Sequence, residues 1–310
     1  MLLWDPLSES FLNTYEMKSL VAIGGRGTVV KVLNKKSNKI EIAKFVAECS
    51  VINWFHGKES SIPQEVNILR QCDHPNIIKI VEYFTFNTGF CHIMEYPDAN
   101  WDSGSDIFST YLHRNFPPSN SEVDFATDHL DSLVRESSKL NIPTIDLFNF
   151  ISTYHPLDET ILRHIFRQMA AGVHYMHSQD MIHRDLKDEN IVIDSNLNPK
   201  LIDFDVASFA KPEKSVFQGV VGTIQYTAPE SLRNGCYEGK PADIWSLGVT
   251  LYVMCKDKLP FQNSLEIIQA VDLSTLESVP IKDLCSAMLN LNPSERPTIQ
   301  EVLNHPWLML

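Results

Sequence analysis

The chain has 310 residues and a formal net charge of −13 at pH 7, and 44% of its residues are hydrophobic. This length is sufficient for one domain with a substantial buried core. The acidic balance argues against nucleic acid and anionic membrane surfaces as partners and favours basic partners.

Six cysteines are present, without a CxxC pair or a His/Cys spacing typical of metal ligands. We therefore expect reduced thiols and a cytoplasmic or nuclear location. The start of the chain, Met1 to Trp4, is followed directly by Asp5-Pro6, so it is expected to form neither a signal peptide nor a membrane span.

The first predicted elements surround a cluster of glycines. Residues 1–20 are of mixed composition and are expected to lead into the first strand. Residues 21–32 contain Gly24, Gly25 and Gly27, which predict a turn between two strands. The turn is either an ordinary β-turn or a loop that lays backbone N–H groups over phosphates, where side chains would obstruct the approach.

Three further elements follow before the composition changes. Residues 40–45 predict a strand that contains Lys44 close to its end. Residues 63–70 predict a helix with a proline near its first turn. Residues 90–97 predict another strand, which ends at Pro97, a residue without a backbone N–H.

An exposed insertion is predicted from residue 98 to residue 144. This segment carries Gly, Ser and Asn and contains Pro117-Pro118. Within it, residues 122–140 have apolar positions spaced as in an amphipathic helix. The insertion is either a loop with one packed helix or a docking element for a partner.

Helical periodicity returns after the insertion. Residues 145–151 predict a short helix, and Asp158 is expected to cap a long helix that extends to about His177. The apolar residues of the long helix predict a place in the core.

The most informative segment is the polar loop His183–Asn190, which contains Asp185, Lys187 and Asn190 and precedes an apolar run. Phosphoryl transfer needs a carboxylate for the attacking hydroxyl, a cation for the phosphoryl group and an amide oxygen for a metal ion. A polar loop with ordinary capping residues would explain one short match, but not several motifs in a fixed order. Two further motifs follow along the chain, Asp203-Phe204-Asp205 and Ala228-Pro229-Glu230.

The order and spacing of these motifs resemble the catalytic domain of eukaryotic-type serine/threonine protein kinases. Within them the chain is similar to the calmodulin-kinase-like group, and its hinge and catalytic loop are similar to those of the Pim and PAS-domain kinases. The resemblance implies an α+β, two-lobed fold over residues 21–310, in a chain that is expected to be monomeric. A small, mostly antiparallel β lobe with one helix would span about residues 21–97, and a larger helical lobe about residues 145–310.

The resemblance also implies ATP and Mg²⁺ or Mn²⁺ as cofactors and assigns roles to individual residues. Asp185 would be the catalytic base, Lys187 the phosphate cation, and Asn190 and Asp203 the metal ligands. The other residues assigned to ATP are Ile23, Gly24, Gly25, Gly27, Val29, Lys44 with its partner Glu65, Met94, Glu95 and Asp146. The substrate-binding residues would be Glu189 and Thr223, the latter through a hydroxyl that bridges the catalytic aspartate and lysine, and the structural ones Glu230, Asp243 and Arg296.

Three departures from the family pattern leave a second interpretation open. The glycine loop is about two residues short, Pro97 removes a hinge N–H, and Asp205 stands where the family has glycine. A pseudokinase that acts as an interaction scaffold is therefore the alternative to an active enzyme, although no group needed for the chemistry is missing. Asp205 itself either stiffens its segment and alters the Mg²⁺/Mn²⁺ preference or points to solvent.

A preference for basic substrates is the last prediction from the sequence. Glu189 and Asp146 occupy positions at which acidic residues bind an arginine upstream of the phosphoacceptor in basophilic kinases. A carboxylate pairs well with a guanidinium, because the guanidinium can be held by two hydrogen bonds. We therefore expect Ser or Thr phosphorylation in protein substrates with Arg or Lys two to three residues upstream.

Overall fold

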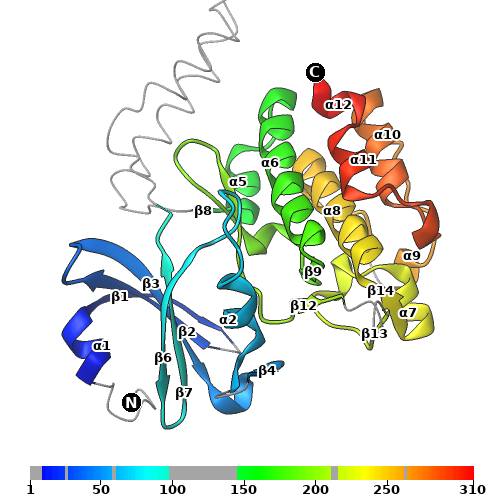
Figure 1. Ribbon diagram of the computed structural model, residues 1–310. Helices are drawn as coiled ribbons and strands as arrows, with labels where there is room; N and C mark the ends of the chain where they lie inside the picture. The colour runs from blue at the N-terminus through cyan, green and yellow to red at the C-terminus, as the bar shows by residue number, and fades with distance from the viewer. Residues whose placement is uncertain (1–8, 25–26, 58–60, 98–144, 211–215, 262–263) are drawn as a thin grey trace, which may run out of the picture.

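The computed structural model describes residues 9–24, 27–57, 61–97, 145–210, 216–261 and 264–310. A strand-rich part from the N-terminal third of the chain lies beside a larger helical part that contains the C-terminus (Figure 1). The predicted two-lobed α+β architecture is thus confirmed. The predicted insertion at residues 98–144, with its candidate helix, lies outside the described residues.

The small lobe is built on a five-stranded sheet with the order β1-β2-β3-β7-β6, in which each pair of neighbours is antiparallel. Its strands are β1 (Tyr15–Gly24), β2 (Gly27–Asn34), β3 (Lys39–Ala47), β6 (Ile80–Phe86) and β7 (Gly89–Glu95). Gly27 lies where β2 passes so close to β3 that a Cβ atom would be 2.4 Å from the carbonyl oxygen of Phe45. Only glycine fits at this position.

The N-terminal segment is more ordered than the sequence predicted. Residues 1–20 were expected only to lead into a strand that begins near residue 21, but helix α1 (Glu9–Thr14) precedes a strand that begins at Tyr15. That expectation was wrong because the segment is fixed by aromatic contacts rather than by a periodic pattern. Phe11 is fully buried and its ring contacts those of Tyr15, Phe45, Phe84 and Phe86.

The helix of the small lobe, α2 (Gln64–Leu69), begins directly after Pro63. Proline suits the start of a helix, because a backbone N–H there has no partner within the helix. It follows the one-turn helix η1 (Glu48–Ser50) and a short hairpin of β4 (Trp54–His56) and β5 (Ser61–Pro63). The buried side of α2 includes Glu65, which directs a carboxylate toward the sheet.

The large lobe surrounds two long helices, α6 (Glu159–Ser178) and α8 (Gly239–Lys256). Asp158 accepts a hydrogen bond from the Thr160 N–H at 2.7 Å and so begins α6 where the sequence predicted. Helix α8 is apolar on nearly all sides, and its residues from Ala242 to Met254 are buried, which places it at the centre of the lobe. No helix in the described part of the chain is long and apolar enough to cross a membrane.

Shorter elements complete the large lobe. The helices are α5 (Leu147–Tyr154), α7 (Pro229–Asn234), α9 (Ser264–Ile267), α10 (Val279–Met288), α11 (Ile299–Leu303) and α12 (Pro306–Met309). The strands are β8 (Ile145–Asp146), β9 (Met181–Ile182), β10 (Ile191–Ile193), β11 (Pro199–Leu201), β12 (Ser208–Phe209), β13 (Val216–Gln218) and β14 (Cys236–Glu238). The one-turn helices are η2 (Asp188–Asn190), η3 (Ile224–Tyr226) and η4 (Pro293–Glu295).

The aromatic cluster around Phe11 generates a stability prediction. Replacing Phe11 by Ala should lower the free energy of unfolding by about 3 kcal/mol, because it removes a fully buried ring and leaves a cavity. Chemical denaturation measures this change. Leu12→Ala is the matched control, since Leu12 lies in the same helix but is 47% exposed. Equal losses in the two variants would contradict a specific role for the buried ring.

Candidate active site

The polar loop between β9 and η2 is held by one buried carboxylate. Asp243, on α8, is 1% exposed and accepts hydrogen bonds from the backbone N–H groups of His183 at 3.0 Å and Arg184 at 2.9 Å. The Nε2 atom of His177 lies 3.0 Å from the same carboxylate. Arg184 adopts a left-handed backbone conformation with φ 69°, which is unfavourable for a non-glycine residue. Strain of this kind persists only where surrounding contacts hold it in place, as Asp243 does here.

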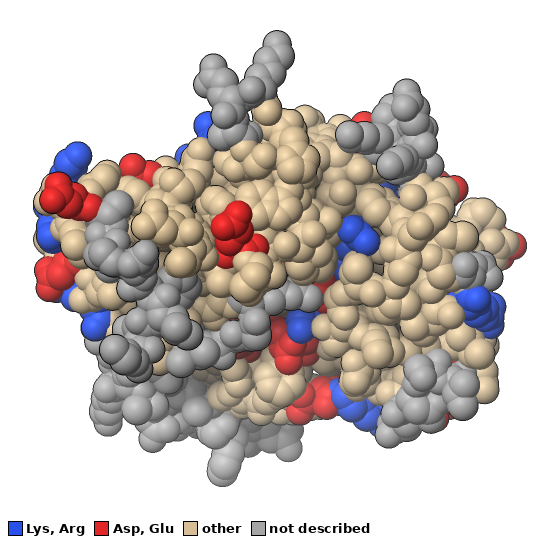
Figure 2. Space-filling view, turned by 90° about the horizontal axis from the view of Figure 1, so that it is seen from below, with Lys and Arg blue, Asp and Glu red and all other residues tan. Residues whose placement is uncertain are grey.

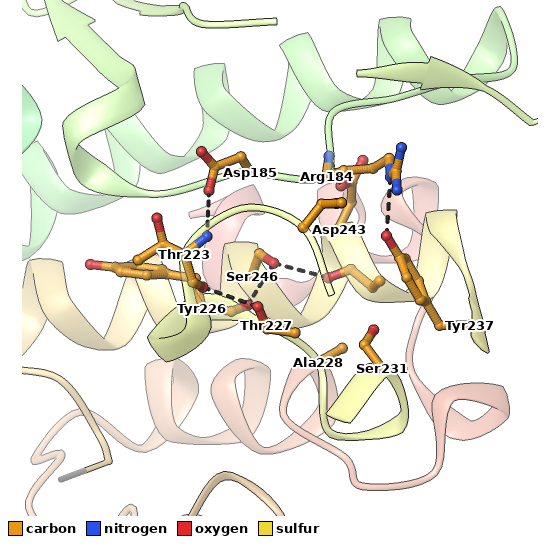
Figure 3. Close-up of a pocket in the computed structure, with 12 residues that line it drawn as sticks. Arg184, Asp185, Thr223, Tyr226, Thr227, Ala228, Ser231, Tyr237, Asp243 and Ser246 are labelled. Carbon is orange, nitrogen blue, oxygen red and sulfur yellow. Dashed lines mark hydrogen bonds between the residues drawn. The ribbon is translucent and has the colours of Figure 1, made fainter. Parts of the chain in front are cut away.

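Asp185 is oriented by contacts from two segments. Its Oδ2 atom accepts a hydrogen bond from Nδ2 of Asn190 at 3.0 Å, and its Oδ1 atom accepts one from the backbone N–H of Thr223 at 2.9 Å (Figure 3). The sequence predicted that the Thr223 hydroxyl would bridge Asp185 and Lys187. The structure differs, because the backbone N–H of Thr223 makes the contact with Asp185.

Two further charged residues of the loop contact each other. The Nζ atom of Lys187 forms an ion pair with Oε2 of Glu189. Lys187 is largely buried, whereas the side chain of Glu189 is 57% exposed. The next carboxylate, Asp188, accepts a hydrogen bond from the Tyr226 hydroxyl at 2.8 Å, and burial raises its pKa above the usual range. These contacts tie the loop to η3.

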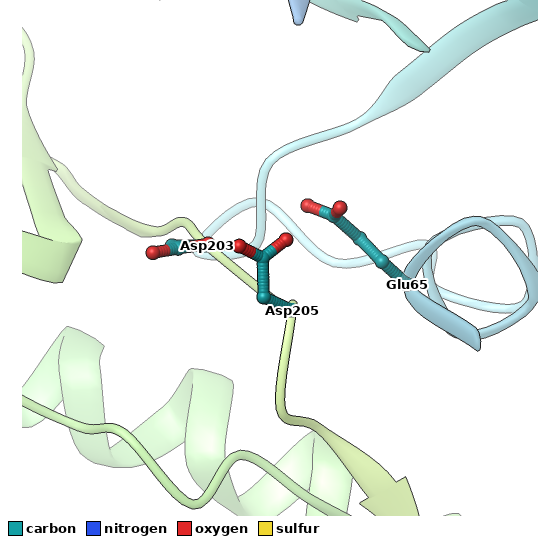
Figure 4. Close-up of side chains that lie close together, drawn as sticks. All are labelled: Glu65, Asp203 and Asp205. Atoms are coloured by element: carbon teal, nitrogen blue, oxygen red, sulfur yellow. The ribbon is translucent and has the colours of Figure 1, made fainter. Parts of the chain in front are cut away.

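A second group of charges joins the two lobes. The Nζ atom of Lys44, on β3, lies 2.9 Å from Glu65, 2.7 Å from Asp205 and 3.2 Å from Asp203. Glu65 belongs to α2 of the small lobe, while the two aspartates follow β11 of the large lobe. Figure 4 shows the carboxyl groups of Glu65 and Asp205 directed toward each other. Asp203 has a left-handed backbone with φ 60°, a second strained position at this site.

The pKa values within this group move in opposite directions. Burial raises the pKa of Glu65, but the charge of Lys44, together with the neighbouring His92 and Asp205, outweighs this effect and holds the pKa well below its usual range. Burial, followed by the negative charge of Glu65, raises the pKa of Asp205 to about 8. Of these two facing carboxyl groups, Asp205 is therefore the one whose neutral form is favoured.

Asp205 does not point to solvent, which corrects one of the two interpretations offered from the sequence. Its side chain is 11% exposed and contacts Lys44. Its backbone does not adopt a positive φ, so the conformation that would require glycine at this position is not used. His92 was not predicted to belong to this group; it is fully buried, with Nδ1 3.4 Å from Oε2 of Glu65.

A cleft of about 830 Å³ brings most of these residues together, a volume in the range of nucleotide-sized pockets. Its roof includes Val29 and Ile42, and Met94 and Glu95 line the connection between the lobes. The predicted site residues that line it are Gly27, Val29, Lys44, Glu65, Met94, Glu95, Asp146, Asp185, Lys187, Glu189, Asn190, Asp203 and Thr223. Gly25 and the side chain of Ile23 lie outside the described residues, although the backbone of Gly24 pairs with Gly27 across β1 and β2.

The comparisons with known proteins agree with this geometry. A family model described as the protein kinase domain matches residues 15–130 and 132–308. The chain belongs to the protein kinase family. The resemblance inferred from the motifs is therefore confirmed.

Several serine/threonine kinases are similar to this kinase domain. Serine/threonine-protein kinase prk-2 of Caenorhabditis elegans is 30% identical over 305 residues, which cover 96% of this chain and 59% of that protein. The PAS domain-containing serine/threonine-protein kinase of Mus musculus is 33% identical over 298 residues, which cover 95% of this chain and 18% of that protein. Serine/threonine-protein kinase pim-2 of Danio rerio is 36% identical over 166 residues, 53% of each chain. The chain thus spans less than two thirds of the length of these relatives.

Protein kinases use ATP and a divalent metal ion, and the residues of this kinase suit such an ion. Asp203 and Asn190 both line the cleft and offer a carboxylate and an amide oxygen, the donors that Mg²⁺ prefers. Asp203 is also the most exposed of the three carboxylates around Lys44, at 35%. A cation bound to these two residues would neutralise charge on the phosphate oxygens of a nucleotide.

The hinge of this kinase is tied to the large lobe by Glu95. Its carboxylate accepts hydrogen bonds from the backbone N–H of Lys79 at 3.0 Å and from Nζ of Lys200 at 2.9 Å. Pro97, two residues on, has no N–H to donate.

Asp146 caps α5 by accepting a hydrogen bond from the backbone N–H of Asn149 at 2.7 Å. Its carboxylate therefore has a structural partner, and the residue also lines the cleft.

Two arginines support the segment that follows the metal-binding motif. Arg296 forms a bidentate ion pair with Glu230, with both N–O distances at 2.7 Å and both side chains buried. Arg184 donates to the hydroxyl of Tyr237 at 3.0 Å, and its guanidinium lies 4.5 Å from the ring centre of Phe217. The sequence predicted the first pair but not the aromatic contacts of Arg184, because they depend on the pairing of β13 with β14.

Gly219 and Gly222, which precede Thr223, allow a test of the contact between Thr223 and Asp185. Both have a positive φ, +79° at Gly222 and +75° at Gly219, so alanine at either should cost about 1–2 kcal/mol. At Gly222 a Cβ atom would also lie 2.7 Å from Oδ1 of Asp185, whereas at Gly219 it would meet nothing within 4 Å.

Gly222→Ala should therefore reduce phosphotransfer by about 100-fold through displacement of Asp185. Gly219→Ala should leave it within a few-fold of the unmodified protein. Steady-state rates and thermal unfolding of both variants separate the two effects. Equal losses of activity would show that backbone strain alone, and not the steric contact, is responsible.

Proposed function

We propose that this chain is an active, ATP-dependent serine/threonine protein kinase that transfers the γ-phosphate of ATP to hydroxyl groups of protein substrates. The observation that carries the proposal is the position of Lys44. Its Nζ atom lies within 3.2 Å of both Glu65 and Asp203, so the phosphate clamp and the metal-binding carboxylate are assembled in one place. Activity in protein kinases requires both to be in position.

The remaining roles follow from the same cleft. Asp185 has an oriented carboxylate that can accept the proton of the substrate hydroxyl, and Asn190 holds it in place. Lys187 lines the same cleft and would be the cation for the transferring phosphoryl group. ATP would lie between the lobes with its adenine near Ile42 and Met94, where the absence of an N–H at Pro97 removes one hinge hydrogen bond.

An interaction scaffold without activity is the competing function, and the departures from the family pattern support it weakly. Because Pro97 has no backbone N–H, one hydrogen bond to adenine is lost, but no group that takes part in the reaction is removed. Asp205 contacts Lys44 without separating it from Glu65. The residues assigned to phosphoryl transfer all line one cleft, which supports the enzyme.

A radiolabelled phosphotransfer assay on generic basic proteins tests the proposal. Asp185→Asn should reduce transfer by about 10³-fold and leave ATP binding largely intact, because it removes the base and not the phosphate clamp. Asp203→Ala should impair both transfer and Mg²⁺-dependent ATP binding, because it removes the metal-binding carboxylate. Transfer by the unmodified chain that persists in the Asp185 variant would reject the role given to this loop, and no transfer at all would favour the scaffold.

We further propose that the substrates carry basic residues upstream of the phosphoacceptor. Glu189 supports this, because its carboxylate is 57% exposed at the mouth of the cleft. Asp146 supports it less, since its carboxylate already caps α5. The net charge of −13 adds a general attraction for basic peptides, although charges beyond about 10 Å are screened at cellular ionic strength.

Charged residues are dispersed over the face of the molecule seen in Figure 2. On the described part of that face, blue and red side chains alternate and are not gathered into one large patch of either sign. On this face, recognition of a basic substrate would therefore depend on single carboxylates near the cleft rather than on a broad acidic surface. We propose a cytoplasmic or nuclear monomer.

The substrate preference is tested with paired peptides that differ only in an arginine two or three residues before the phosphoacceptor. Glu189→Gln should raise KM for the arginine peptide by about fivefold and change KM for its partner little, because it removes one carboxylate–guanidinium contact. The ratio of the two KM values corrects for any effect of Glu189 on Lys187. Asp283→Asn, an exposed carboxylate on α10, is the control. A peptide-library screen that selects acidic or proline-directed sequences would contradict the preference.

A further inference from the structure

We propose that Asp205 is a positioning residue, a second buried carboxylate that holds the ammonium group of Lys44 in place together with Glu65. The inference rests on the proposed function, since Lys44 is assigned to the phosphates of ATP. It goes beyond that function by giving a role to the residue that stands where the family has glycine.

The contacts of Lys44 support this role. Its Nζ atom is 2.7 Å from Oδ1 of Asp205, the shortest of its three carboxylate contacts, compared with 2.9 Å to Glu65 and 3.2 Å to Asp203. The side chains of Lys44, Glu65 and Asp205 are 12%, 5% and 11% exposed. Water therefore competes little for these contacts, and charge-assisted hydrogen bonds are strong under such conditions.

Asp205 also lies close to Glu65, the other residue that holds Lys44. Ligand atoms of Asp205 and Glu65 lie within 4.8 Å of each other, and the two carboxyl groups face each other in Figure 4. Asp205 thus contacts Lys44 and lies next to its partner Glu65, two residues that belong to β3 and α2 of the small lobe. Because Asp205 belongs to the large lobe, it connects that lobe to the pair without using the metal-binding carboxylate.

A third metal ligand is the other role that three neighbouring carboxylates suggest, and the geometry argues against it. Ligand atoms of Glu65, Asp203 and Asp205 lie within 4.8 Å of one another, but the cation among them is the ammonium group of Lys44. Of the three, Asp203 is the most exposed to the cleft, at 35%. A metal ion can reach Asp203 without displacing Lys44, whereas binding to Asp205 would bring it close to the ammonium charge.

Two substitutions separate the positioning role from an effect of charge. Asp205→Ala removes both contacts without adding the backbone freedom of glycine. Asp205→Asn has the same shape, and its amide can accept from Lys44 and donate to Glu65 while carrying no charge. Asp73→Ala, at a carboxylate that is 93% exposed, controls for the loss of an acidic residue.

The first readout is the dissociation constant of ATP, measured by equilibrium titration with and without Mg²⁺. Asp205→Ala should weaken ATP binding by about tenfold, the loss of one charge-assisted hydrogen bond, and Asp205→Asn should stay within about twofold. Tighter ATP binding in both variants would overturn the inference, because Asp205 would then oppose the phosphates. A selective loss of Mg²⁺- or Mn²⁺-dependent binding in both would also overturn it, in favour of a metal ligand.

The second readout does not depend on ATP and so separates this inference from the proposed function. Amide hydrogen exchange in α2, measured without added nucleotide, should be faster in Asp205→Ala than in the unmodified protein and restored in Asp205→Asn. Unchanged exchange in Asp205→Ala would reject the positioning role even in an active kinase. Conversely, a chain that binds no ATP but shows faster exchange in this variant would reject the proposed function and keep the positioning role.

A double-mutant cycle with Glu65→Gln completes the test. If Glu65 and Asp205 both anchor Lys44, either one keeps it partly in position when the other is lost. The effect of Glu65→Gln combined with Asp205→Ala on amide exchange in α2 and on ATP binding should therefore exceed the product of the single effects. Effects that simply multiply would show that the two residues act independently, and would overturn a shared role.

Discussion

The interaction on which this site depends is the placement of one ammonium group among carboxylates from both lobes. Lys44 is largely removed from water, so its charge must be balanced by protein groups. Glu65 supplies this from α2 and Asp203 from the segment after β11, where Asp205 accepts a further hydrogen bond from Lys44. The geometry of an ion contact between two lobes depends on the positions of the elements that contribute its residues. The sheet, α2 and the large lobe must all keep their positions for this contact to form.

In the large lobe, a buried carboxylate holds the catalytic loop in place. Asp243 stands on α8, the most completely buried helix among the described residues, and fixes two consecutive N–H groups of the catalytic loop. The pair of Glu230 and Arg296 fixes the following segment, and removal of one partner from such a buried pair costs roughly 3–5 kcal/mol. Arg184 then stacks on Phe217, so β13 and the loop are joined by a cation–π contact rather than by a further carboxylate.

Short-range patterns in the sequence were sufficient to predict groups whose role depends on fixed spacing along the chain. The loop with Asp185, Lys187 and Asn190 is of this kind, and the cap at Asp158 follows from local hydrogen bonding alone. Phe11 could not be predicted as a core residue, because most of its aromatic partners lie on β3 and β6, far along the chain. For the same reason, the contact between Thr223 and Asp185 was assigned to the wrong atom. Its geometry is set by the left-handed backbone at Gly222, which no side-chain pattern encodes.

Asp205 shows why a departure from a family pattern has to be judged by its surroundings. Taken alone, an added carboxylate beside a metal-binding aspartate predicts repulsion and a loss of function. In the folded protein the same group meets an ammonium at 2.7 Å, and its raised pKa favours the neutral form, which reduces repulsion with Glu65. Since its backbone does not need a positive φ, the conformational reason for glycine is absent as well. A side chain at this position thus adds a contact between the lobes and leaves Asp203, the proposed metal ligand, lining the cleft.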